Sequence, residues 1–113
     1  MKATIKMFKA LSDETRLRIF LLFIQSEELC VYELVNILNM EQSRISHSIR
    51  ILREAGLIVN RREGRWIIYS INPEIKNNEI IYGLKNEAKL PEQDLENFAK
   101  CKKKNIREKC KCN

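Results

Sequence analysis

The sequence predicts a mainly helical domain that carries one small β-hairpin. Two observations support this prediction. Apolar residues recur at the i, i+3, i+4, i+7 spacing of an amphipathic helix over most of the chain. Around residues 57–71 the pattern changes to β-branched runs separated by a glycine turn. A length of 113 residues fits a single domain, and 44% hydrophobic with 32% charged residues is typical of a globular protein rather than a disordered one.

The first third of the chain predicts two helices. A short one is expected over residues 4–11. A second follows Ser12 and Asp13, because a serine–aspartate pair before an apolar stripe is a helix start signal. The stripe of this second helix consists of Leu17, Phe20, Leu21 and Ile24.

The next two apolar stripes predict two helices that together form a helix-turn-helix. The first ends at Asn39 and the second ends at Gly56, which we place just after the last helical residue. The turn between them has about three residues, and helices joined so tightly are typical of this motif. Glu41 or Gln42 stands where a small polar N-cap is usual. The two apolar stripes are Val31, Leu34, Val35 and Leu38, then Ile45, Ile49 and Leu52.

A hairpin and two more helices complete the prediction. The strands are expected at 57–60 and 66–71, with Gly64 in the turn. A hairpin directly after a helix-turn-helix makes a winged helix. Asn72 is expected to cap the next helix, with Pro73 as its first residue and a stripe formed by Ile81, Leu84 and Ala88. Pro91 then ends this helix or begins another, whose apolar residues are Leu95, Phe98 and Ala99. We therefore divide the chain into a winged-helix domain, residues 1–90, and a C-terminal helix with a basic cysteine-containing tail, residues 91–113.

The distribution of charge separates the tail from a possible DNA-binding surface. Residues 1–99 are neutral overall, with 14 basic and 14 acidic side chains, so the last fourteen residues carry the whole net charge of +6. Residues 42–66 nevertheless hold six arginines and no lysine, against two glutamates. Arginine's planar fork suits contacts to phosphates and base edges, so this region is the better candidate for binding nucleic acid.

The helix that begins at Gln42 is the predicted DNA-recognition helix. Its apolar stripe must face inward, so the polar residues between should project from its N-terminal half into a major groove. The hairpin arginines would reach the backbone or minor groove beside it. An ordinary polar surface helix and a solvated turn are the alternative interpretations. The candidate DNA-binding residues are Gln42, Ser43, Arg44, Ser46, His47, Ser48, Arg50, Arg61, Arg62 and Arg65.

Five segments of the chain resemble the ArsR/SmtB family of metal-sensing repressors. They start at Phe8, Glu28, Gln42, Leu52 and Arg62, and read FKALSDETRLRI, ELCVYEL, QSRISH, LREAGLI and REGRW. The resemblance spans about residues 5–85. It implies a homodimeric winged-helix repressor that binds double-stranded operator DNA with inverted symmetry and leaves it when a metal or metalloid binds. It also implies a dimer interface built from two helices, here about 5–11 and 74–90.

Four cysteines predict thiol chemistry rather than structural disulfides. Cys101, Cys110 and Cys112 lie within twelve residues among lysines, which favour the thiolate. If the helix continued, Cys101 and Cys110 would stand about 13 Å apart, so the tail must bend after about Lys104 for the three to share one ion. Three sulfur ligands favour As(III) or Sb(III). Cd(II), Pb(II) or Zn(II) are alternatives that could add Cys30 as a fourth ligand.

The resemblance supports this assignment in part. Arsenic-responsive members can carry three cysteines on the first helix of the helix-turn-helix, whereas this chain keeps Cys30 but has Tyr32 and Val35 in the other two places. The His/Asp pattern of zinc-sensing members is absent from residues 74–90. The remaining candidate is therefore a three-thiol metalloid site that has moved to the C-terminal tail. The alternatives are incidental cysteines, or a redox or sulfide-responsive pair, and Cys30 can equally be a small core residue.

Other function classes are less compatible with the sequence. No Ser/His/Asp or Cys/His set and no glycine-rich phosphate loop accompanies the single histidine, so an enzyme is not expected. The longest apolar run has six residues, far below the ~20 that a membrane span needs. The first residues lack the apolar segment of a signal peptide, so we expect a cytoplasmic protein without a membrane partner.

Overall fold

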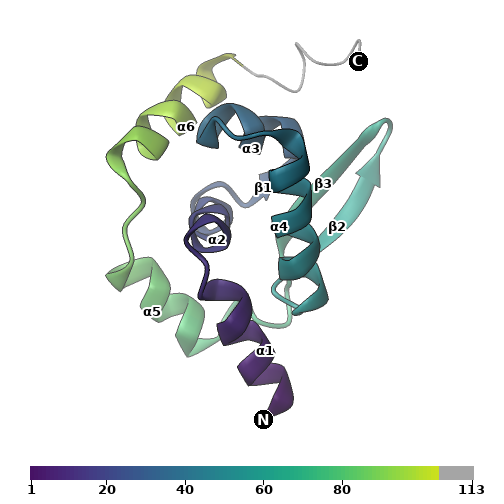
Figure 1. The fold of residues 1–113 in the computed structure, drawn as a ribbon, viewed down its shortest axis with the longest axis vertical. Coiled ribbons are helices and arrows are strands. Elements are labelled where there is room, and N and C mark those ends of the chain that lie inside the picture. Colours follow the sequence, from purple (N-terminus) through teal and green to yellow (C-terminus); the bar gives the residue numbers. More distant parts are fainter. Residues whose placement is uncertain (105–113) are drawn as a thin grey trace.

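The computed structural model describes residues 1–104 and confirms a mainly helical winged helix-turn-helix. The elements in chain order are α1 (Lys2–Leu11), α2 (Glu14–Ser26), β1 (Glu28–Leu29), α3 (Val31–Leu38), α4 (Gln42–Glu54), β2 (Ile58–Glu63), β3 (Trp66–Ile71), α5 (Glu79–Glu87) and α6 (Glu92–Lys104). Helix α2 lies at the centre, the other helices surround it, and the β2–β3 hairpin projects beside α4 (Figure 1).

The helix boundaries lie where local chemistry places them. Asp13 caps α2, and its carboxylate accepts a hydrogen bond from the backbone N–H of Arg16 at 3.0 Å. Helix α3 ends at Asn39 in the left-handed region, with φ +54°, and α4 is followed by Gly56 at φ +79°. Glu41 is the N-cap of α4 and makes no side-chain cap hydrogen bond. The first backbone N–H groups of α4 therefore stay available to a ligand.

The sheet contains one strand that the sequence pattern does not predict. Strands β2 and β3 form the expected hairpin, with Gly64 at φ +60° in the short turn. The two-residue strand β1 pairs with β3, so the strand order is β1-β3-β2. Two residues are too few to show an alternating pattern, and only the approach of β3 makes Glu28 and Leu29 a strand.

The apolar stripes of the helices and the base of the hairpin meet in one core. Side chains from α2, α3, α4 and the hairpin are at most 1% exposed, among them Phe20, Phe23, Leu34, Leu52 and Ile58. Burying each such side chain stabilises the fold by about 1.5–3 kcal/mol. The core therefore fixes the face that α4 turns outward.

The predicted helix start at Pro73 is wrong. Asn72 does accept a hydrogen bond from the N–H of Glu74, but the chain makes only a turn there. Helix α5 begins at Glu79, after Asn78 adopts an extended conformation and caps the N–H of Ile80 at 2.8 Å. Asparagine side chains compete with the helical backbone for hydrogen bonds and so favour caps over helix interiors. The helix expected at 74–90 is thus shortened to nine residues.

Helix α6 confirms the restart after Pro91 and packs against α3. The two helices lie side by side at the end of the molecule opposite the N-terminus (Figure 1). The division of the chain at residue 90 stays a prediction, and Cys110 and Cys112 lie outside the described residues.

Candidate nucleic-acid interface and thiol groups

Helix α4 presents a polar surface because its apolar stripe is fixed in the core. Ile45 and Leu52 are fully buried and Ile49 is 2% exposed. Six of the seven candidate residues on this helix are exposed: Gln42, Ser43, Arg44, Ser46, His47 and Arg50.

Ser48 is the exception and corrects the expectation. Its side chain is only 4% exposed, because position 48 falls on the inward face, one turn after Ile45 and next to Ile49. Ser48 therefore packs within the subunit and is not placed to contact DNA.

Two of the three arginines of α4, Arg44 and Arg50, each have an intramolecular partner. The Arg44 guanidinium donates a hydrogen bond to the hydroxyl of Thr15 at 3.0 Å, which ties α4 to the first turn of α2. An Arg50 guanidinium nitrogen lies 3.1 Å from Nδ1 of His47. A guanidinium has five N–H donors, so both side chains keep donors for phosphates or base edges. Thr15 carries no motif that would have predicted this contact.

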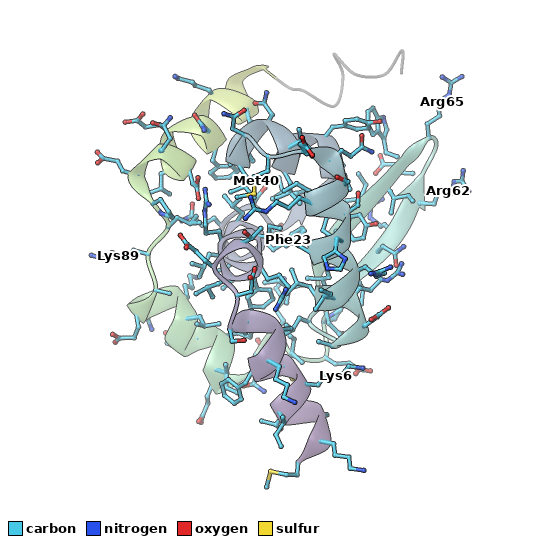
Figure 2. The ribbon with its side chains drawn as sticks, in the orientation of Figure 1. Lys6, Phe23, Met40, Arg62, Arg65 and Lys89 are labelled. Atoms are coloured by element: carbon cyan, nitrogen blue, oxygen red, sulfur yellow. The ribbon has the colours of Figure 1, made fainter. Side chains whose placement is uncertain are left out.

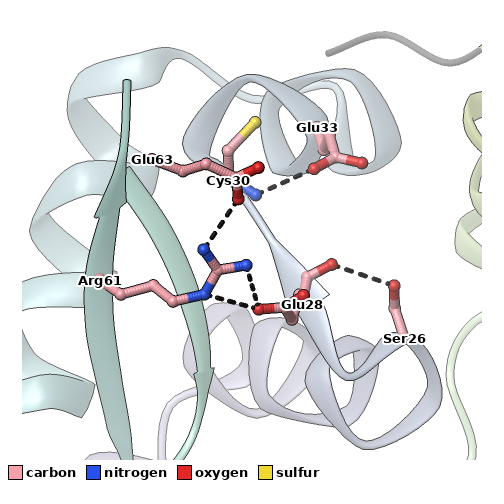
Figure 3. Close-up of polar contacts among 6 residues, drawn as sticks. All are labelled: Ser26, Glu28, Cys30, Glu33, Arg61 and Glu63. Atoms are coloured by element: carbon pink, nitrogen blue, oxygen red, sulfur yellow. Dashed lines mark hydrogen bonds and ion pairs between the residues drawn. The ribbon is translucent and has the colours of Figure 1, made fainter. Parts of the chain in front are cut away.

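Arg61 differs from the other hairpin arginines because two carboxylates hold it. Its guanidinium donates to Glu28 at 2.7 and 3.0 Å and to Glu63 at 2.8 Å (Figure 3). These hydrogen bonds raise its pKa above the ordinary arginine value. The contact with Glu28 depends on strand β1, which is why the sequence pattern did not reveal it.

The register of the hairpin also separates Arg61 from Arg62. Arg61 is paired with Ile68 and Arg62 with Ile67, so the two arginines lie on opposite faces of the hairpin. Arg62 and Arg65 point away from the body of the protein near the hairpin tip (Figure 2). In the described part of the chain neither has a carboxylate partner within salt-bridge distance. The positive charge that the hairpin offers therefore comes chiefly from Arg62 and Arg65.

A small cavity connects the recognition helix with the hairpin. It has a volume of about 260 Å³ and is lined by Gln42 and Ser46 of α4 and by Arg65 and Trp66 at the hairpin. Tyr32 of α3 packs edge-on against Trp66, with ring centroids 5.7 Å apart and an interplanar angle of 87°. This aromatic pair fixes the hairpin relative to the helix-turn-helix, so the two basic surfaces have a defined spacing.

Cys30 is a core residue in this structure. Its side chain is 1% exposed at the N-cap of α3, where it forms a capping box with Glu33, whose carboxylate accepts from the Cys30 N–H at 3.0 Å (Figure 3). Burial raises the pKa of its thiol to about 11. The thiol is protonated at neutral pH and is a poor metal ligand in this conformation.

Cys101 is also buried, at 1% exposure on the inward face of α6. Neither Cys30 nor Cys101 forms a disulfide. Within residues that the structure describes, no group of three or more His, Cys, Asp or Glu side chains could hold a metal ion. The predicted three-thiol site thus depends on Cys110 and Cys112 and stays a prediction.

Both helices that the family resemblance assigns to a dimer interface carry exposed apolar side chains. On α1, Ile5 is 47% and Phe8 is 53% exposed, and on α5, Tyr82 is 71% exposed. None of the helices in the described part of the chain is both long and apolar enough to cross a membrane.

Comparison with known proteins agrees with these features. The family model for the arsR family of bacterial regulatory proteins matches residues 13–59, which run from the cap of α2 into β2. The arsenical resistance operon repressor of Escherichia coli is 45% identical over 71 residues, which cover 63% of this chain and 61% of that protein. A cadmium resistance transcriptional regulatory protein of Staphylococcus aureus is 39% identical over 69 residues, which cover 61% of this chain and 57% of the relative. The chain therefore spans about three fifths of these relatives.

Solved structures extend the likeness to about three quarters of the chain. HlyU from Vibrio cholerae is 31% identical, with a TM-score of 0.65 over 74% of this chain and 88% of that chain. A homodimeric winged helix-turn-helix DNA-binding domain from Mycobacterium bovis has a TM-score of 0.66 at 26% identity, over 74% of this chain and 76% of that one. Together with the family match, these similarities show that the chain belongs to the ArsR family of bacterial regulatory proteins.

Proposed function

We propose that this protein is a homodimeric transcriptional repressor that binds double-stranded operator DNA and is released by a soft metalloid. The observation that carries the DNA-binding part is the polar surface of α4 beside Arg62 and Arg65 at the hairpin, which form no ion pair with a carboxylate of the described residues. A helix with exposed small hydroxyls and arginines fits the major groove. The relatives named as repressors support the same function.

In this proposal, the position and exposure of each side chain determine which part of the DNA it contacts. Gln42, Ser43, Ser46 and His47 would meet base edges or nearby phosphates from the first turns of α4. Arg44 and Arg50 would add forked contacts, and Arg62 and Arg65 would hold the backbone beside the groove. Arg61 contributes less in this proposal, because Glu28 and Glu63 offset its charge.

A second copy of the chain would cover the exposed apolar residues of α1 and α5. Phe8 and Tyr82 are large and more than half exposed, which is unfavourable in water and favourable in an interface. Two recognition helices related by a two-fold axis would then read an inverted repeat with half-sites about 34–36 Å apart.

The proposed effector is As(III) or Sb(III), bound by thiolates of Cys101, Cys110 and Cys112. Three thiols without an accompanying histidine or carboxylate cluster match the preference of these ions for sulfur. When three thiols bind As(OH)₃, three sulfur–arsenic bonds form and three arsenic–oxygen bonds break, and each thiol proton leaves with a hydroxide as water, so no oxidant is required. The relative named as an arsenical resistance repressor supports this effector.

Fluorescence anisotropy of labelled operator DNA, titrated with arsenite under reducing conditions, tests the proposal. We expect operator release by arsenite in the wild type, and loss of release in Cys110→Ser and Cys112→Ser. Cys30→Ser is the matched control and should respond to arsenite like the wild type, because the Cys30 side chain is buried in the core. Release that needs Cys30 but not the tail cysteines contradicts the ligand assignment.

Cadmium is a second candidate effector because the Staphylococcus aureus relative is named for cadmium resistance. Cd(II) would favour four ligands and could recruit Cys30. The same titration with Cd(II) distinguishes the two ions, since only a cadmium site would depend on Cys30. Release by peroxide or persulfide, but not by either ion, would indicate a thiol-redox regulator instead.

A further inference from the structure

Helix α4 lies between α2 and the hairpin, so it has one flank toward each of them (Figure 1). Gln42 and Ser46 are on the hairpin flank, because they line the cavity that Arg65 also lines. Arg44 is roughly opposite to both around the helix axis, since two residues along an α-helix correspond to a rotation of about 200°. Its guanidinium donates a hydrogen bond to the hydroxyl of Thr15, in α2, at 3.0 Å. Arg44 therefore occupies the α2 flank.

The face between the two flanks is the one that a DNA groove would receive. Ser43, His47 and Arg50 follow the 3–4–7 spacing that places residues on one side of a helix, and all three are exposed. The buried Ile45 and Ile49 lie on the opposite side. An α-helix with its side chains is about 10–12 Å across and the major groove is about 12 Å wide. A helix that fills the groove in this way has the phosphates of one strand along each flank.

We propose that Arg44, oriented by Thr15, forms a second phosphate-binding edge on the α2 flank of the recognition helix. The inference rests on the proposed function and deepens it. Arg44 holds the backbone of one strand with the donors that Thr15 leaves free, while Arg62 and Arg65 hold the backbone of the other strand. Thr15 does not touch DNA in this arrangement. It is a positioning residue that acts through the Arg44 guanidinium.

Thr15 is suited to orient Arg44 because its own position is fixed. It is 6% exposed in the first turn of α2, and α2 packs against α4. A long side chain loses rotamer freedom when it binds, and a guanidinium that is already held loses less. The Thr15 hydroxyl carries no charge, and no carboxylate of the described residues lies within salt-bridge distance of Arg44. The contact therefore orients Arg44 and leaves its full positive charge for a phosphate.

A double-mutant cycle tests the coupling between Thr15 and Arg44. The probe is a DNA duplex that the wild-type chain selects from a random-sequence pool, and fluorescence anisotropy measures its affinity. We expect Thr15→Val, which removes the hydroxyl, to weaken binding about fivefold, and Thr15→Ser, which keeps the hydroxyl, to match the wild type. In an Arg44→Ala background, Thr15→Val should cause no further loss. An equal loss in both backgrounds overturns the positioning role of Thr15.

Neutral methylphosphonate groups test the phosphate contact without any change at the buried position 15. Single phosphates of the selected duplex are replaced in turn, and each loss of affinity marks a phosphate that the wild-type protein holds. We expect Arg44→Ala to lose sensitivity to one set of positions and Arg65→Ala to another, with the two sets on opposite strands of each half-site. His47→Ala, on the face between the flanks, is the matched control and should keep both sets.

The outcomes distinguish this inference from the proposed function. If Arg44→Ala keeps every phosphate sensitivity of the wild type and changes only the preferred bases, Arg44 reads a base edge and the second phosphate-binding edge is overturned. If the positions lost in Arg44→Ala lie on the same strand as those lost in Arg65→Ala, the two-flank arrangement is overturned. If the wild-type chain selects no duplex, the proposed DNA-binding function itself fails.

Discussion

At the residue scale, the three hairpin arginines carry the same charge but differ in their partners. Arg61 is held by Glu28 and Glu63, whereas Arg62 and Arg65 point outward from the tip. A phosphate beside Arg61 would also lie near the two carboxylates, whose repulsion offsets the attraction of the guanidinium, so this contact gains little.

We expect Arg62→Ala and Arg65→Ala each to reduce the slope of log K against log salt by about one, because each removes one phosphate contact. Arg61→Ala should change the slope by clearly less. The measurement is operator anisotropy over a series of salt concentrations. A slope change for Arg61→Ala as large as for Arg65→Ala would show that DNA displaces the two glutamates.

The buried thiol of Cys30 makes stability depend on alkaline pH. Burial raises the thiol pKa from 9.0 to about 11, so the folded chain keeps a proton that the unfolded chain releases between these values. Its contribution is complete below pH 9.0 and is lost as the pH rises towards about 11. We expect the free energy of unfolding to fall by about 2 kcal/mol more in the wild type than in Cys30→Ala over this interval. Urea denaturation at both ends measures the difference, and parallel curves for the two proteins would contradict it.

At the element scale, a glycine-to-alanine substitution is expected to change the stability of the protein in opposite directions at two positions. Gly64 has φ +60° in the hairpin turn, whereas Gly83 lies within α5, and no atom lies within 4 Å of a Cβ added at either position. Gly64→Ala should destabilise the protein by about 1 kcal/mol through backbone strain alone. Gly83→Ala should stabilise it by up to about 1 kcal/mol, because alanine is the better helix former.

Thermal unfolding of the two variants checks this pair. Gly64→Ala should also weaken operator binding, since Arg65 follows directly in the turn, while Gly83→Ala serves as the control for a glycine far from the hairpin. An equal loss of stability in both would indicate that α5 does not continue through position 83 as a helix.

At the scale of the whole molecule, operator binding should require two copies of the chain. Phe8 and Tyr82 are exposed on α1 and α5, where the proposed interface lies. We expect Phe8→Asp and Tyr82→Asp to shift the sedimentation coefficient from dimer to monomer and to lower operator affinity at least tenfold, because a monomer contacts one half-site. Leu95→Asp, at an apolar position that is 40% exposed on α6, is the matched control and should remain dimeric. A dimeric Tyr82→Asp protein would place the interface elsewhere.

The order of the helices and the hairpin, though not strand β1, could be predicted from the sequence because it depends on local patterns. The stripe formed by Ile45, Ile49 and Leu52, the cap at Asp13 and the left-handed position at Gly56 each act within one or two turns of chain. Of the seven candidates that these patterns indicated on α4, six are exposed. The start of α5 could not be predicted correctly, since both Asn72 and Asn78 offer a cap and only the observed backbone distinguishes them.

The tertiary structure alone decided which groups are available for function. Arg61 is neutralised by Glu28, 33 residues away in the chain, and Cys101 is buried on α6, although no local pattern indicates either. The burial of Ser48, by contrast, follows from its place beside Ile45 and Ile49 on the inward face of α4. The sequence determined which chemical groups the protein carries and which helices hold them, because helix periodicity is local. Their accessibility depends on side chains far away along the chain, such as Arg18 and Asp94, which come together only when the helices pack.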